Sequence, residues 1–180
     1  GSIRVLRSKN GQAWETVLLL TVQDITDSTV LDARDPKISI TPDKRLMLHV
    51  GVTQYHGSKA IGFHPVVCFS KDGRAWSDPV PLNVTEQWPW RPTWHNDHAW
   101  VVAYAGTPNK AILMTGEDGI QYREHFVFEI PGSQPNEVTL RFTESDRMLA
   151  LLRGDRGDRR AVLGWADPPY QKWEYIKTEQ

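Results

Sequence analysis

One heptapeptide that occurs twice limits the fold of this chain more than any other feature. Residues 8–14 read SKNGQAW, and residues 70–76 read SKDGRAW. Asn-Gly or Asp-Gly between two strand-like runs is the strongest short signal for a β-hairpin. The Asn or Asp side chain accepts hydrogen bonds from amides of its own turn, and the glycine tolerates a positive φ. The sequence therefore predicts hairpins of one kind at both places.

Two weaker copies extend this pattern along the chain. Asp118-Gly119 is followed by Tyr122, and a copy without glycine covers residues 167–173. The closing aromatic residues of the four copies stand at positions 14, 76, 122 and 173, so the copies are 62, 46 and 51 residues apart. A period of this size is typical of a four-stranded unit that repeats along a chain.

A second repeat lies between these turns. Residues 38–48 resemble residues 139–149, and Arg45 and Arg147 are 102 residues apart, which is two periods of 51. Residues 93–102 fill the middle position, and each copy consists of two strand-like runs around a polar turn. No segment of twelve residues keeps a helical period without Gly or Pro, so we expect an all-β chain.

The turns at 8–14 and 70–76 resemble the Asp boxes of sialidases and related six-bladed β-propellers, and the resemblance covers nearly the whole chain. It implies an all-β Asp-box β-propeller with about three and a half four-stranded blades of a six-bladed ring. The whole chain, 1–180, would be one partial domain. Its parts would be the last two strands of one blade (1–30) and three blades (31–85, 86–131 and 132–180), with Gly1 and Ser2 a remnant of cloning.

Composition excludes several classes of function. The net charge of −1 over 180 residues lacks the basic excess of a nucleic-acid-binding protein. No apolar run approaches the roughly 20 residues that a membrane helix needs. Cys68 is the single cysteine, so no intrachain disulfide can form, and we expect it to be buried in the run 65–69. The histidines show no spacing typical of metal ligands, and neither a metal nor a cofactor is expected.

Antiparallel strand order predicts where the chemistry lies. The links between units and the loops between second and third strands share one end of the sheets. Arginine binds carboxylates as a fork, aromatic rings stack on sugars, and two carboxylates can cleave a glycosidic bond. The residues gathered at this end are the candidate catalytic carboxylates Asp35 and Glu137 and the candidate substrate-binding residues Arg34, Arg91, Arg153, Trp90, Tyr55 and His56.

Arg34, Asp35 and Trp90 also have a structural interpretation. Arg34-Asp35-Pro36 resembles the Arg-Ile-Pro with which sialidase domains begin, and that resemblance implies a carboxylate-binding role for Arg34. Arg34 and Asp35 would equally serve as an ion pair that holds the start of a strand. Trp90 would equally serve as packing between blades, and both interpretations are kept.

The resemblance implies part of a sialidase-like, glycan-processing propeller, inactive alone and an exo-sialidase-like glycoside hydrolase when the ring is complete. The alternative is a non-catalytic propeller that binds a glycan or a protein and assembles by dimerisation. A carbohydrate ligand and a homodimer that closes a ring are the expected partners, without nucleic acid or membrane. The resemblance favours an extracellular or periplasmic location.

Overall fold

Every regular element in the described part of this computed structural model is a β-strand, which confirms the all-β expectation. The structure describes residues 1–21, 29–105, 110–157 and 159–178. All of its strand pairings are antiparallel. The chain divides into two compact units, residues 1–86 and 87–180, which are described separately.

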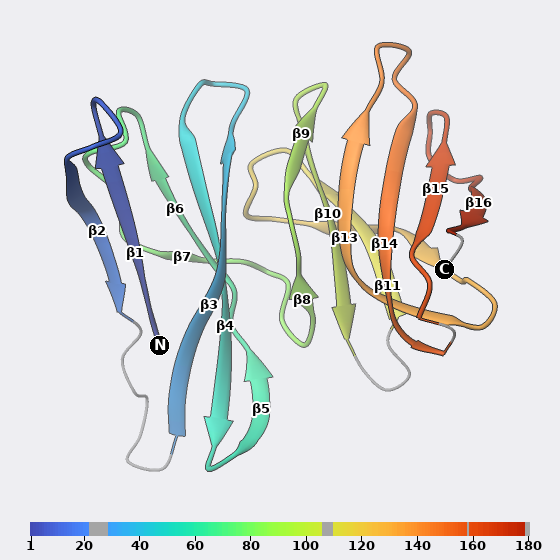
Figure 1. The fold of residues 1–180 in the computed structure, drawn as a ribbon, viewed down its shortest axis with the longest axis horizontal. Helices are drawn as coiled ribbons and strands as arrows, with labels where there is room; N and C mark the ends of the chain where they lie inside the picture. The colour runs from blue at the N-terminus through green and yellow to red at the C-terminus, as the bar shows by residue number, and fades with distance from the viewer. Residues whose placement is uncertain (22–28, 106–109, 158, 179–180) are drawn as a thin grey trace. The chain divides into compact units, whose positions relative to one another are not determined.

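The first unit contains a two-stranded and a five-stranded sheet. The heptapeptide at 8–14 joins β1 to β2, and the one at 70–76 follows β6 (Figure 1). In the larger sheet the order is β3-β4-β6-β7, and β5 pairs with the far end of β4. The strands are β1 (Ser2–Ser8), β2 (Trp14–Thr21), β3 (Thr29–Ile40), β4 (Leu46–His56), β5 (Lys59–Phe63), β6 (Val66–Ser70) and β7 (Val80–Pro81).

The core of the first unit lies between its two sheets. Leu48 and Val50 of β4 pack with Cys68 of β6, and they face Ile3 and Leu20 of the two-stranded sheet. Cys68 is fully buried, as the apolar run around it predicted, and burial raises the pKa of its thiol. Alternation along β4 places this apolar row on one face of its sheet.

The second unit contains two larger sheets that pack on one another. The first has the order β12-β11-β10-β8 with β9 on β10, and the second has the order β13-β14-β15-β16 (Figure 1). The strands are β8 (Trp88–Pro89), β9 (Thr93–His95), β10 (His98–Ala105), β11 (Lys110–Gly116), β12 (Arg123–Phe128), β13 (Ser133–Phe142), β14 (Met148–Gly157), β15 (Val162–Ala166) and β16 (Glu174–Lys177).

The Asp-Gly turns have the hydrogen bonds that the sequence predicted. Asp72 Oδ1 accepts from the amides of Arg74 at 2.8 Å and Ala75 at 3.0 Å. These bonds lower the pKa of Asp72. Asn10 Oδ1 bonds the amides two and three residues on in the same way, at 3.0 Å each. The carboxylate or amide therefore closes its own turn.

The copy without glycine keeps the same backbone. Gly11, Gly73 and Gly119 have φ values of 74°, 70° and 73°, and Tyr170 takes their position with a φ of 63°. The indole of Trp173 donates to Tyr170 O at 3.0 Å, just as Trp14 donates to Gly11 O at 3.2 Å. Tyr170 is held there because its hydroxyl donates to Asp146 O at 2.8 Å.

Candidate functional site

The first strand of each larger sheet is interrupted three to five pairs from the turn that follows it. In the first unit, the pair Arg34–Gly51 is followed by Lys37–His49, so β3 has one residue more than β4 between these pairs. In β13, Pro135 pairs with Gly154 and Val138 with Leu152, again with one extra residue. The break between β8 and β9 repeats this, because Pro89 pairs with Ala103 and Thr93 with Trp100.

Five of the eight residues that the sequence proposed for the site lie in or directly beside these interruptions. A bulge interrupts the alternation of side chains and aims a residue that would otherwise follow the pleat. The five are Arg34 and Asp35 in β3, Trp90 and Arg91 between β8 and β9, and Glu137 in β13.

Sequence reasoning missed the bulges, although a signal for them was present. Each bulge region contains or borders a proline: Pro36, Pro92 and Pro135. Proline cannot donate to a strand ladder, so within sheets it is confined to edges, strand starts and bulges. In the structure, the backbone of Asp35 also departs from a regular strand, because its φ of 52° lies outside the extended region.

The bulge in β13 places Glu137 against an arginine of the neighbouring strand. Glu137 Oε1 lies 2.6 Å from Arg153 Nη1, and their side chains are 30% and 57% exposed. The hydrogen bond and charge of Glu137 raise the pKa of Arg153, and Asp155 and Tyr104 contribute in the same direction. Oδ1 of the buried Asn136 accepts a hydrogen bond from the backbone amide of Glu137 at 2.6 Å and so holds the backbone of the bulge.

Two aromatic side chains extend this group. Tyr104 belongs to β10 and lies within electrostatic reach of Arg153. The rings of Tyr104 and Trp90 have centroids 6.5 Å apart and are tilted by 52°. Both side chains are half-buried. We name Trp90, Tyr104, Asn136, Glu137 and Arg153 the Glu137 cluster.

A hollow of about 490 Å³ lies where β12 leads into β13. Ser133 Oγ and Gln134 Oε1 are buried on its wall, and neither has a hydrogen-bond partner among the described residues. A buried polar atom without a partner costs free energy, so a ligand that bonds it gains affinity. Its lining residues are Lys110, Val127, Phe128, Glu129, Ile130, Pro131, Ser133, Gln134 and Pro135.

The first unit has a different pairing from the one expected. Arg34 forms its ion pair with Asp32 and not with Asp35, and this hydrogen bond lowers the pKa of Asp32. The guanidinium of Arg34 lies 5.9 Å from the ring centroid of Tyr55, which is cation–π distance. Asp35 is half-buried in the bulge, and His56 is exposed at the end of β4.

The structure thus brings together Arg34 with Tyr55 in the first unit, and Glu137 with Arg153 in the second. Arg91 is exposed in its bulge, and Trp90 lies beside Tyr104. Because the eight residues belong to two units, the convergence of all of them on one site stays a prediction.

No group of three or more His, Cys, Asp or Glu side chains in the described part of the chain is arranged to hold a metal ion. None of the described elements is a helix long and apolar enough to cross a membrane.

Comparison with known proteins defines the fold and not the activity. No family model matches the chain, and no curated protein matches it. One similar solved structure is the crystal structure of a protein of unknown function from Dyadobacter fermentans DSM 18053, with a TM-score of 0.75 and 15% sequence identity. The match covers 97% of this chain and 57% of that one, so the chain spans little more than half of its length.

Proposed function

We propose that this chain is part of a β-propeller that binds a glycan, and that the Glu137 cluster is its binding site. The observation that carries the proposal is the Glu137–Arg153 pair, set by a bulge beside Tyr104 and Trp90. A carboxylate accepts hydrogen bonds from sugar hydroxyls, while a guanidinium donates them. The aromatic rings supply a surface on which a pyranose stacks.

The charge of the cluster favours a neutral sugar over an acidic one. Arg153 already has a carboxylate partner at 2.6 Å, so the pair is close to neutral. An acidic sugar would have to displace Glu137, whereas adjacent hydroxyls can bond to both members of the pair at once. The hollow that includes Pro135 is lined by residues just before Asn136 and Glu137 in the chain, and it offers room for a second sugar ring.

The propeller is supported by the internal repeat. In three sheets the first strand is interrupted by a bulge or a break with one extra residue, and four turns share a positive φ at the same position. The sheets fall in the chain at 29–81, 88–128 and 133–177, and β1 and β2 precede them. These sheets would be blades of a ring of six.

A second candidate function is glycoside hydrolysis. Asp35 and Glu137 are 102 residues apart and both lie in the bulge of a first strand. A glycosidase needs two carboxylates roughly 5–10 Å apart. Part of a sialidase-like ring would supply such a pair only if both bulges reach one substrate.

The test is binding of an immobilised panel of neutral and sialylated oligosaccharides to the purified chain. We expect retention of neutral sugars, weakened at least about tenfold by Glu137→Gln and by Tyr104→Ala, which is a difference of about 1.4 kcal/mol. Glu144→Gln is the matched control, because Glu144 is exposed in the turn between β13 and β14. Absence of binding, or binding that Glu137→Gln leaves unchanged, contradicts the proposal.

The hydrolase candidate has its own measurement. Fluorogenic glycosides incubated with the wild-type chain and with Asp35→Asn report turnover directly. We expect none from the 180-residue chain, and turnover that Asp35→Asn abolishes would favour the enzyme over the binding protein.

A further inference from the structure

The outer face of the two-stranded sheet carries apolar side chains that nothing in the described residues covers. Ile3 and Leu20 point into the core of the first unit. On the other face, Leu6, Trp14 and Leu19 are 49%, 60% and 52% exposed. Leu6 lies opposite Thr16, Trp14 opposite Ser8 and Leu19 opposite Arg4. Because side chains alternate along each strand, these three side chains share the face opposite to Ile3 and Leu20.

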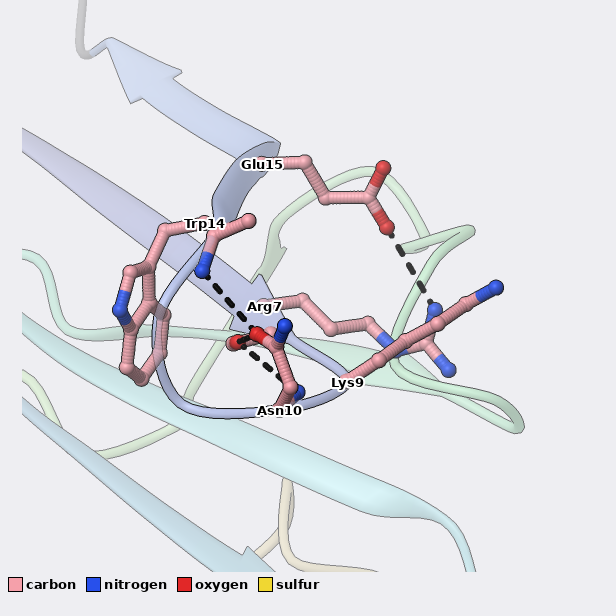
Figure 2. Close-up of a pocket in the computed structure, with 7 residues that line it drawn as sticks. Arg7, Lys9, Asn10, Trp14 and Glu15 are labelled. Atoms are coloured by element: carbon pink, nitrogen blue, oxygen red, sulfur yellow. Dashed lines mark hydrogen bonds and ion pairs between the residues drawn. The ribbon is translucent and has the colours of Figure 1, made fainter.

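Trp14 differs from its counterpart in the second unit. Trp173 closes the last turn of the repeat, and it packs on two rings of β12 in the preceding sheet. Its centroid lies 6.0 Å from that of Phe126 and 4.8 Å from that of Phe128. Trp14 closes the first turn in the same way, but its ring stands clear of the Arg7–Glu15 ion pair and remains exposed (Figure 2). Its position is one that a neighbouring sheet covers elsewhere in the fold.

The outer face of the last sheet is uncovered as well. Leu151, Leu163 and Ile176 lie side by side across β14, β15 and β16. Leu151 and Ile176 are each 51% exposed, whereas the next residue along β14, Leu152, is fully buried in the core. Apolar patches of this kind on a sheet face are typical of interaction surfaces.

In the second unit, the equivalent face of the preceding sheet is covered by the sheet that follows it. Val102, Leu113 and Phe126 form the equivalent row across β10, β11 and β12. That row packs against the inner face of the next sheet, which includes Leu152, and against the turn residue Trp173. By analogy, the row at Leu151 is suited to pack against the face of another sheet and against the tryptophan that closes a turn of that sheet.

We propose that these two faces bind one another between two copies of this chain, head to tail. The last sheet of one copy receives the outer face of β1 and β2 of the next, and Trp14 packs on Ile176 as Trp173 packs on Phe126. A second copy is the fitting occupant because one chain presents both halves of a contact that its own second unit already contains.

Sedimentation velocity across micromolar concentrations tests this proposal. We expect the wild type to exceed its monomer mass of 20.6 kDa as concentration rises. Trp14→Ser and Ile176→Glu should each weaken association about tenfold or more. Ile61→Glu should not, because Ile61 is 48% exposed but belongs to β5, which is a strand of neither face. Circular dichroism checks that each variant remains folded.

A mixture separates this arrangement from a face-to-face dimer. Trp14→Ser keeps the last sheet intact, and Ile176→Glu keeps the first sheet intact. Head-to-tail binding predicts that the two variants associate more strongly when mixed, through one intact junction, than either does alone. A wild type of 20.6 kDa at every concentration, a mixture that stays monomeric, or assembly disrupted by Ile176→Glu but not by Trp14→Ser overturns the proposal.

Discussion

Asp35 and Glu137 both lie in a bulge of the first strand of their sheets, Asp35 as its first unpaired residue and Glu137 as its second. They are 102 residues apart, the same separation as Arg45 and Arg147 in the turns that follow. Both bulges therefore contain a carboxylate, at neighbouring positions of the bulge. Glu137 pairs with Arg153, whereas the ion pair of Arg34 is formed with Asp32.

Neighbouring leucines of β14 should differ sharply in their effect on stability. Leu152→Ala leaves a cavity in the core of the second unit and should lower the free energy of unfolding by about 2–5 kcal/mol. Leu151→Ala removes a half-exposed side chain and should change it by under about 0.5 kcal/mol in the monomer. Denaturant unfolding of both variants at one low protein concentration gives the comparison. Equal losses would contradict the assignment of Leu152 to the core face and Leu151 to the outer face of β14.

Two glycine substitutions test the turns. Gly73→Ala places a Cβ at a φ of 70° and 3.3 Å from Leu46 Cδ1, so strain and a close contact act together. Gly11→Ala has the same strain, with a φ of 74°, but its Cβ meets nothing within 4 Å. We expect losses of about 1–2 kcal/mol for Gly11→Ala and more for Gly73→Ala, measured by chemical denaturation. A stabilising effect of either would contradict the left-handed conformation.

His49 should make the protein sensitive to mild acid. Burial, followed by the charge of Lys37, lowers the pKa of His49 from 6.5 to about 3. Between about pH 6.5 and pH 3, the unfolded chain binds a proton at His49 that the folded chain does not bind. The free energy of unfolding therefore falls as the pH is lowered through this range, by up to about 1.4 kcal/mol per pH unit. Unfolding at pH 7 and pH 5 should show this loss in the wild type and much less of it in His49→Met. His56→Gln is the control, because His56 is exposed, and a loss unaffected by His49→Met would place the sensitive group elsewhere.

The turns could be predicted from the sequence because their chemistry is local. Asp72 bonds amides two and three residues away, so its motif contains every atom involved. Tyr170 shows the limit of that reasoning, since a tyrosine takes the glycine position through a bond to Asp146, 24 residues earlier. No motif of seven residues contains that partner.

The site was predicted at the level of loops but not of partners. Arg34 pairs with Asp32 because residues two apart lie on the same face of a strand, whereas the bulge takes Asp35 out of that alternation. Glu137 meets Arg153 only because the bulge shifts the register of β13 against β14. A register shift depends on the paired strand, so the sequence of β13 alone does not give it.

The most direct test of the glycan site is the indole N–H spectrum of the protein during titration with a neutral oligosaccharide. The chain has eight tryptophans, and Trp90→Phe identifies the resonance of Trp90 by its loss. We expect this resonance to move as sugar is added, and Glu137→Gln to suppress the movement. Sugar that shifts the Trp14 resonance and leaves that of Trp90 in place, or shifts neither, would contradict this expectation.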